Sequence, residues 1–329
     1  MTARSVLWLL ACVISSTAFA QEATTGGSPS GITPDQVNAQ NVAELKMGMK
    51  GVAVLRAQVL LDRAHFSPGE IDSVFGGNLH KAVIAYQESH KLKPSGVIDE
   101  DMWRALDADP DPILIPYSID PADVAGPFTP VPEDMMEKSK LPALGYASPQ
   151  ELLGEKFHVR PEFLQALNPG KDLGKAGETI VVPDVARRVP LPKAAKVFVD
   201  KSDSAVTLAD AEGRTIAHFP ATLGSKHDPL PLGEWKIQGI SRNPKFHYNP
   251  KLFWDADAKD EKAWIQAGPN NPVGVVWLDL SIKHYGIHGT PEPRNIGKTE
   301  SHGCIRLTNW DALTLADAVR AGTPAILRK

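Results

Sequence analysis

The sequence predicts a multidomain protein that ends in a mostly β domain, a sandwich or flattened barrel with one late helix, preceded by a small all-α module and a small α+β module. Three observations support this fold class. The 329 residues are enough for two or three compact domains. Residues 46–107 carry apolar side chains at helical spacing. From residue 194 onward, apolar and polar side chains alternate over short runs that are separated by turns.

The N-terminus has the pattern of a secretory signal peptide over residues 1–20. Arg4 supplies a positive charge, an apolar run covers residues 6–14, and residues 18–20 form a small-x-small cleavage site. A lipoprotein signal ending at Cys12 is a weaker alternative, because almost no apolar segment precedes that cysteine. We therefore expect an exported, periplasmic protein. We expect no transmembrane segment, since no later run is long and apolar enough to span a bilayer.

A flexible linker and a helical module follow. Residues 21–43 are rich in Gly, Ser, Thr and Gln, a composition typical of flexible linkers. Residues 44–108 show helical spacing, and Asp99 is placed to cap a last short helix. The order of loops and helices in this module resembles the helical peptidoglycan-binding domain found beside many wall enzymes; the matching stretches are residues 66–76, 82–87 and 95–99. A helical spacer without a ligand is the alternative.

Residues 109–190 comprise an irregular Pro-rich segment and then a small α+β module. Pro149 and Pro161 stand at first helical positions, and residues 177–183 predict a short strand. This order is similar to a lysin motif, a glycan-binding module, whose first strand would lie near residues 115–119 with a long insertion after it. A structural linker domain is the alternative.

Residues 194–329 form the predicted mostly β domain. Its short alternating runs predict strands, and residues 210–213 predict a hairpin turn. One helix is expected over residues 312–319, with Asn309 before it and Gly322 after it.

Removal of the signal peptide leaves Cys304 as the one cysteine, so the mature chain is expected to have no internal disulfide. An unpaired thiol in an exported protein calls for an explanation, because oxidising compartments consume free thiols. A buried structural cysteine is the plain alternative. Against it, two histidines and Arg306 are close in sequence, and imidazole or cationic neighbours activate a thiol as a nucleophile. Gly303 also lets backbone N–H groups approach an oxyanion closely.

The arrangement of His288, a loop, and then Ser301-His302-Gly303-Cys304-Ile305-Arg306 resembles the catalytic motif of the L,D-transpeptidases. The resemblance covers residues 194–329, and further matching segments lie at residues 230–235, 268–274 and 296–297. It implies that Cys304 is the nucleophile and that His288 is the general base, oriented by the Gly289 carbonyl group. It also implies an oxyanion site at His302, Gly303 and Cys304, and a role in pocket shape or substrate binding for Ser301 and Arg306.

The resemblance further implies a two-step acyl transfer that needs no cofactor. The cysteine would attack the bond between the L-centre of the third residue and the terminal D-Ala of a tetrapeptide stem. An amine of another stem would then accept the acyl group, which gives a 3→3 cross-link. Water, a free D-amino acid or a lysine of an outer-membrane lipoprotein are alternative acceptors at the same site. The expected partners are therefore stem peptides and glycan, and the net charge of -4 gives no general attraction to nucleic acid.

A zinc site, an inactive wall-binding protein and a papain-like wall hydrolase are alternatives to the transpeptidase. His284, His288, His302 and Cys304 are residue types that bind zinc, although the catalytic roles leave no spare ligand. An inactive wall-binding protein would not require an intact cysteine and histidine. In the papain-like wall hydrolases the cysteine precedes the histidine, the reverse of the order here. Finally, we expect the charged stretch 255–262, between Trp254 and Trp264, to close over the cleft as a lid.

Overall fold

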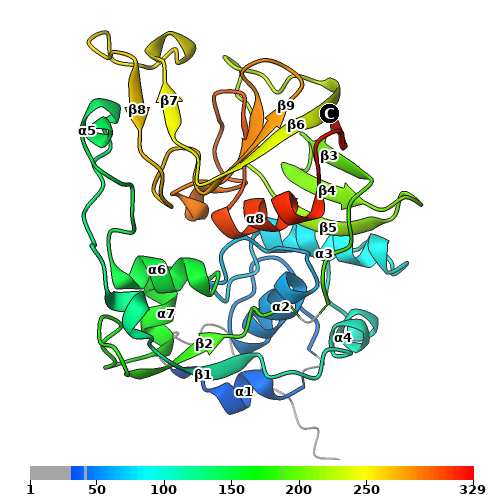
Figure 1. Ribbon diagram of the computed structural model, residues 1–329. Helices are drawn as coiled ribbons and strands as arrows, with labels where there is room; N and C mark the ends of the chain where they lie inside the picture. The colour runs from blue at the N-terminus through cyan, green and yellow to red at the C-terminus, as the bar shows by residue number, and fades with distance from the viewer. Residues whose placement is uncertain (1–30, 41–42, 188) are drawn as a thin grey trace, which may run out of the picture.

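The computed structural model describes residues 31–40, 43–187 and 189–329 (Figure 1). The predicted signal peptide and most of the predicted linker lie outside the described residues. Within them, no helix combines the length and the apolar character needed to cross a bilayer. In Figure 1 the N-terminal helices form the lower half of the molecule and the large sheet forms the upper half.

Part of the segment predicted as a flexible linker is helical. Helix α1 (Pro34–Asn38) begins after Thr33, whose hydroxyl accepts a hydrogen bond from the Gln36 backbone while the Gln36 side chain accepts one in return. Val37 is fully buried, and the Asn38 side chain donates to the Leu114 carbonyl oxygen at 3.2 Å. The linker prediction is therefore wrong for these residues, because a capping box and one apolar contact outweigh the polar composition.

The predicted helical module is confirmed. It contains α2 (Val52–Arg63), α3 (Gly77–Ser89) and α4 (Glu100–Leu106). As predicted, Asp99 caps α4, with its carboxylate accepting a hydrogen bond from the Met102 backbone at 3.0 Å.

The second module has the order strand, helix, helix, strand. Strands β1 (Leu114–Ser118) and β2 (Thr179–Pro183) pair antiparallel, and helices α6 (Pro149–Lys156) and α7 (Pro161–Leu167) lie between them in the chain. The long insertion after β1 carries the short helices η2 (Pro121–Val124) and α5 (Met135–Ser139). Buried side chains of both modules form one continuous hydrophobic core. Residue 108, the expected boundary, is therefore not a packing boundary, and we call both modules together the N-terminal body.

The C-terminal domain is mostly β, as predicted, and its half-barrel sheet has a second core of its own. The eight strands lie in the order β11-β10-β9-β6-β12-β3-β4-β5. The late helix α8 (Asn309–Ala318) lies between the sheet and the N-terminal body, and Thr308 rather than Asn309 caps it. The strands are β3 (Lys196–Asp200), β4 (Ala205–Ala209), β5 (Thr215–Pro220), β6 (Gly233–Arg242), β9 (Val276–Leu280), β10 (Gly286–His288), β11 (Ile305–Arg306) and β12 (Pro324–Arg328).

The N-terminal body covers the edge strand β5 of this sheet. The Ser67 backbone N–H donates to the His218 carbonyl oxygen, and the His218 N–H donates to the His65 carbonyl oxygen, both at 2.9 Å. Helix α3 lies alongside β5, so the two halves of the chain are joined through backbone as well as side chains (Figure 1).

A two-stranded ribbon projects from the large sheet. It consists of β7 (Phe246–Tyr248), the short helix η3 (Pro250–Leu252) and β8 (Ala263–Ile265), and we call residues 246–265 the ribbon. A small third core joins the ribbon to the insertion of the second module, through buried Leu144, Tyr248 and Ile265. Helix α5 packs beside β8 in the same cluster (Figure 1).

Candidate active site

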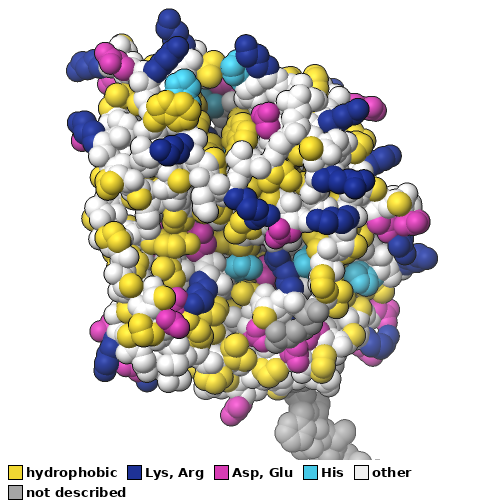
Figure 2. All heavy atoms as spheres, in the orientation of Figure 1, with side chains coloured by type: hydrophobic (Ala, Val, Ile, Leu, Met, Phe, Trp, Pro, Cys, Tyr) yellow, Lys and Arg dark blue, Asp and Glu magenta, His cyan; other side chains and the backbone are white. Residues whose placement is uncertain are grey.

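A cavity of about 700 Å³ lies between the sheet and the ribbon. Figure 2 shows a recess at the top of the molecule with hydrophobic and histidine side chains at its edge. The segment around α5 adds Asp134 and Met135 to the cavity wall, so the N-terminal body takes part in it. The other lining residues include Trp277, Tyr285, His288, Cys304 and Arg306 from the sheet domain, and Phe246, Tyr248, Phe253, Asp255 and Asp260 from the ribbon.

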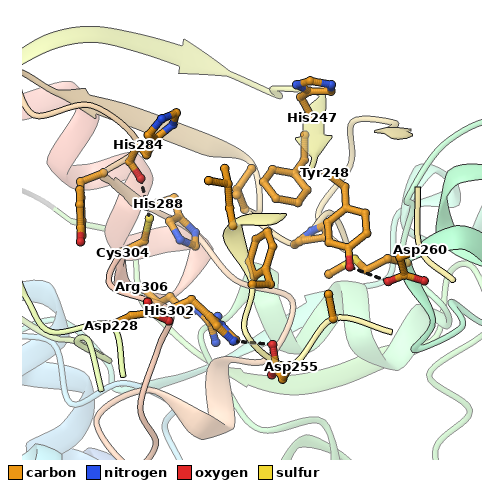
Figure 3. A pocket seen from close by; sticks show the side chains of 18 of the residues that line it. Asp228, His247, Tyr248, Asp255, Asp260, His284, His288, His302, Cys304 and Arg306 are labelled. Carbon is orange, nitrogen blue, oxygen red and sulfur yellow. Dashed lines mark hydrogen bonds and ion pairs between the residues drawn. The ribbon is translucent and has the colours of Figure 1, made fainter. Parts of the chain in front are cut away.

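Cys304 reaches the cavity from the residue before β11. Strands β10 and β11 run parallel, with Ile287 opposite Ile305, and this pairing brings the two predicted clusters together. The half-buried Cys304 Sγ lies 3.8 Å from the His284 carbonyl oxygen (Figure 3). Burial raises the pKa of the Cys304 thiol, while a hydrogen bond from the Gly286 backbone and the charge of Arg306 act in the opposite direction.

His288 is the last residue of β10 and is buried at the same cavity. Its Nδ1 lies 2.7 Å from the Gly289 carbonyl oxygen, the contact that the family resemblance implies. Because a carbonyl oxygen only accepts, this contact requires the proton on Nδ1 and leaves Nε2 unprotonated in the neutral ring. Burial lowers the pKa of His288 to about 3, with Arg306 contributing in the same direction. The Trp277 ring stacks on the imidazole, with centroids 5.4 Å apart.

The loop before Cys304 is held in a tight conformation. The buried Ser301 hydroxyl donates to the Cys304 carbonyl oxygen at 2.6 Å, and Ser301 is not among the residues that line the cavity. This contact within the loop fixes the backbone at Cys304, and the role of Ser301 in pocket shape or substrate binding stays a prediction. Gly303 has φ +93°, and a Cβ there would lie 2.7 Å from the Tyr285 ring, so a larger residue would be strained.

His302 faces the ribbon. Its Nε2 lies 2.8 Å from Asp255 Oδ1, and the Phe253 ring meets the imidazole edge-on at 5.2 Å (Figure 3). The stretch expected to act as a lid thus contacts the catalytic motif directly. Arg306 lines the cavity, and its charge lowers the pKa of His288 and opposes the rise in the pKa of Cys304.

Sequence reasoning missed several residues of this site. Trp277 lines the cavity and its ring stacks on His288, and nothing in its local sequence marks either contact. Asp134 and Met135 precede the sheet domain by many residues, and no local pattern marks them. Over the described ranges, no three or more His, Cys, Asp or Glu side chains are grouped so that they could hold a metal ion.

Comparison with known proteins finds a matching family for a segment in each half of the chain. The L,D-transpeptidase catalytic domain family matches residues 194–327, and a peptidoglycan binding domain family matches residues 50–106. The YkuD protein of Bacillus licheniformis, whose name includes L,D-transpeptidase, is 31% identical over 175 residues, which are 53% of this chain and 89% of that protein. Escherichia coli YbiS, whose name also includes L,D-transpeptidase, is 27% identical over 187 residues, covering 54% of this chain and 60% of that protein.

Among solved structures, similarity is found to an L,D-transpeptidase from Xylanimonas cellulosilytica, with a TM-score of 0.36, 16% identity, and coverage of 88% of this chain and 99% of that one. L,D-transpeptidase 3 from Mycobacterium tuberculosis gives a TM-score of 0.35 and 16% identity over 47% of this chain and 75% of that one. The sequence relatives carry the assignment, because the chain spans most of the Bacillus licheniformis protein at 31% identity. The chain belongs to the L,D-transpeptidase family.

Proposed function

We propose that the protein is a peptidoglycan L,D-transpeptidase in which Cys304 is the nucleophile and His288 is the general base. The observation that carries this proposal is the pairing of the two parallel strands, which directs both residues into one cavity. The Gly289 carbonyl group holds the imidazole in the tautomer whose Nε2 can take a proton. This arrangement corresponds to the base and orienting group of a catalytic triad, with a carbonyl oxygen in place of the acid.

The first half-reaction is acylation. The Cys304 thiol proton passes to His288 Nε2 as Sγ attacks the carbonyl carbon between the L-centre of the third stem residue and the terminal D-Ala. When the tetrahedral intermediate collapses, the C–N bond breaks. The D-Ala amine leaves with the proton held by His288, and a thioester remains on Cys304.

The second half-reaction transfers the acyl group. An amine attacks the thioester carbon, and the surplus proton of the amine passes to His288. The C–S bond then breaks, and Cys304 recovers its proton from the imidazole. When the amine belongs to the third residue of another stem, the product is a 3→3 cross-link. Water, a free D-amino acid or a lipoprotein lysine would give hydrolysis, exchange or protein attachment.

The electrostatics favour proton transfer during the attack over a preformed ion pair. The pKa of His288 is lowered to about 3 and the pKa of the thiol is raised, both chiefly by burial, so both groups are neutral near pH 7. Arg306 is the cation that favours the thiolate as it forms. We therefore assign Arg306 to stabilising the developing charge, and the backbone of His302, Gly303 and Cys304 to the oxyanion site.

The N-terminal body would hold the enzyme on its substrate. Its match to a peptidoglycan binding domain supports binding of stem peptides or glycan, and the strand-helix-helix-strand module is the second candidate for a glycan contact. This combination suits an enzyme exported to the periplasm, where the wall is located.

The proposal is tested with the mature enzyme, tetrapeptide-rich peptidoglycan and mass spectrometry of the muropeptides produced. The wild type should release D-Ala and form cross-linked dimers, and Cys304→Ala should do neither while still sedimenting with the wall. Release of D-Ala by Cys304→Ala would overturn the assignment of the nucleophile. Trimmed tripeptides without dimers would identify water as the acceptor. A carbapenem should add its mass to the wild type and leave Cys304→Ala unmodified.

A further inference from the structure

Asn309 lies directly behind the segment that orients His288. It is buried, and its Oδ1 accepts a hydrogen bond from the Val275 backbone at 3.2 Å. A Cβ on Gly289 would lie only 2.1 Å from the same Oδ1, so the Gly289 backbone rests against the Asn309 amide. Since the Gly289 carbonyl oxygen contacts His288 Nδ1, a shift of Asn309 would move the group that orients the imidazole.

The side chain that fixes Asn309 comes from the other half of the chain. Asn309 Nδ2 donates to both carboxylate oxygens of Glu155, at 3.1 and 3.0 Å, and to the Pro269 carbonyl oxygen at 3.2 Å. Glu155 belongs to helix α6 of the second module and lies 154 positions away in the sequence. It also accepts a hydrogen bond from the Tyr146 hydroxyl at 3.0 Å. A carboxylate is thus used to hold one amide rather than to balance a cation.

We propose that Glu155 is a positioning residue for the catalytic histidine, acting through the Asn309 side chain and the Gly289 backbone. The inference rests on the proposed role of His288. It assigns the second module a part in the reaction that is separate from any contact with glycan.

The chemistry explains why a carboxylate suits this position. An ionised carboxylate offers only acceptors, so Oε1 accepts from Asn309 and Tyr146, and Oε2 accepts from Asn309, without a competing donor. Displacing a reacting group by about 1 Å can cost about 100-fold in rate. The groups facing Glu155 are Tyr146 from the preceding loop, Glu151 from its own helix and Asn309 from α8. Burial raises the pKa of Glu155 to about 7, so a proton on this carboxyl competes with the acceptor function near neutral pH.

The test compares Glu155→Leu, which has no acceptor, with Glu155→Gln, which keeps one oxygen. We expect kcat to fall about 10- to 100-fold in Glu155→Leu, with KM changed by less than about threefold, because the contact positions the base and does not touch substrate. Glu155→Gln should recover a large part of that loss. The rate at which a carbapenem acylates Cys304, followed by intact mass, should fall in parallel with kcat.

Glu162→Gln is the matched control. Glu162 lies in the next helix of the same module and also reaches the sheet domain, through an exposed contact with Arg294 at 3.0 Å. Neither Glu162 nor Arg294 is among the residues that line the cavity, so kcat of Glu162→Gln should equal the wild-type value. Wild-type kcat in a folded Glu155→Leu would overturn the inference, and so would a loss confined to KM. The proposed function has its own test, because an active Cys304→Ala would remove that assignment whatever the Glu155 variants do.

The pH profile provides a readout that a purely structural role would not change. Neither reacting group titrates near neutral pH, so an ionisation near pH 7 belongs to another group. Deprotonation of Glu155 restores both acceptors, and kcat of the wild type should therefore rise with pH through about 7. Glu155→Gln should lack this rise. If kcat of Glu155→Gln still rose with pH through about 7, Glu155 would be excluded as the source of that rise.

Discussion

The two walls of the cavity differ in how firmly the protein holds them. His288 ends β10 and Cys304 directly precedes β11, the strand that pairs with β10 in the eight-stranded sheet, and His288 is buried beside a large hydrophobic core. The ribbon opposite has strands of three residues each, and its own core is small. Two of its tryptophans, Trp254 and Trp264, remain 62% and 57% exposed. Local opening costs least where few apolar contacts are buried, so the ribbon is the wall expected to move.

We therefore expect the sheet wall to govern the chemical step and the ribbon wall to govern entry of substrate into the cavity. The proposed nucleophile and base are positioned by the sheet, and small displacements there should reduce kcat. In the proposed function, the ribbon would control how a stem peptide enters and how well water is excluded, and changes there should appear mainly in KM. Substitutions on the two walls therefore test whether this division holds.

The largest effect is expected for His288→Gln on the sheet wall. Glutamine cannot take the thiol proton, and loss of a general base lowers rates by about 100- to 10,000-fold. Steady-state release of D-Ala measures the change. The same substitution on the ribbon, His247→Gln, lies in the same cavity at an exposed position and should change kcat by no more than about twofold. Equal losses in the two variants would contradict the division between the walls.

An intermediate effect is expected for Ile265→Ala on the ribbon. Ile265 is fully buried in the third core, and removing its side chain should cost about 2–5 kcal/mol of local stability. The ribbon should then open more often, raising KM and the rate of proteolysis within residues 255–262 while kcat changes little. Ile265→Val, which costs about 0.5–1.5 kcal/mol, should give a smaller change in the same direction. A fall in kcat with unchanged protease resistance would indicate that the ribbon is as rigid as the sheet.

The smallest effect is expected for Asp255→Asn, which weakens the contact between the ribbon and His302. Even a fully charged contact at an exposed position contributes only about 0.2–1 kcal/mol, so KM should rise by at most about fivefold. Asp257→Asn removes the same charge two residues away, where the carboxylate accepts from the Lys259 backbone instead, and provides the control. An equal KM change in both variants would mean that general charge matters and the His302 contact does not.

Local patterns in the sequence predicted much of the fold. Helical spacing located the helices of the first module, Asp99 marked the start of α4, and alternation located several strands of the C-terminal domain, but not β10, β11 or β12. The expected first strand near residues 115–119 is present as β1 and pairs with β2. Each of these features depends on residues that are neighbours in the chain, and such patterns are readable without knowledge of the fold.

The unpredicted features depend on contacts between distant segments. Composition gave no sign that residues 34–38 form a helix, because the burial of Val37 depends on a core built by later residues. The same holds for Met135 in the cavity wall and for the contact between Glu155 and Asn309. Catalytic roles for Cys304 and His288 remain predictions from the motif, now supported by their common cavity.

The contact between the N-terminal body and strand β5 affects how readily the large sheet could aggregate with other chains. An open edge strand presents unpaired backbone groups that recruit strands of other chains and start aggregation. Here the loop at Ser67 uses both the N–H and the carbonyl oxygen of His218. The N-terminal body therefore shields this edge of the sheet, and the segment that we propose to hold the enzyme on the wall would also limit edge-to-edge association.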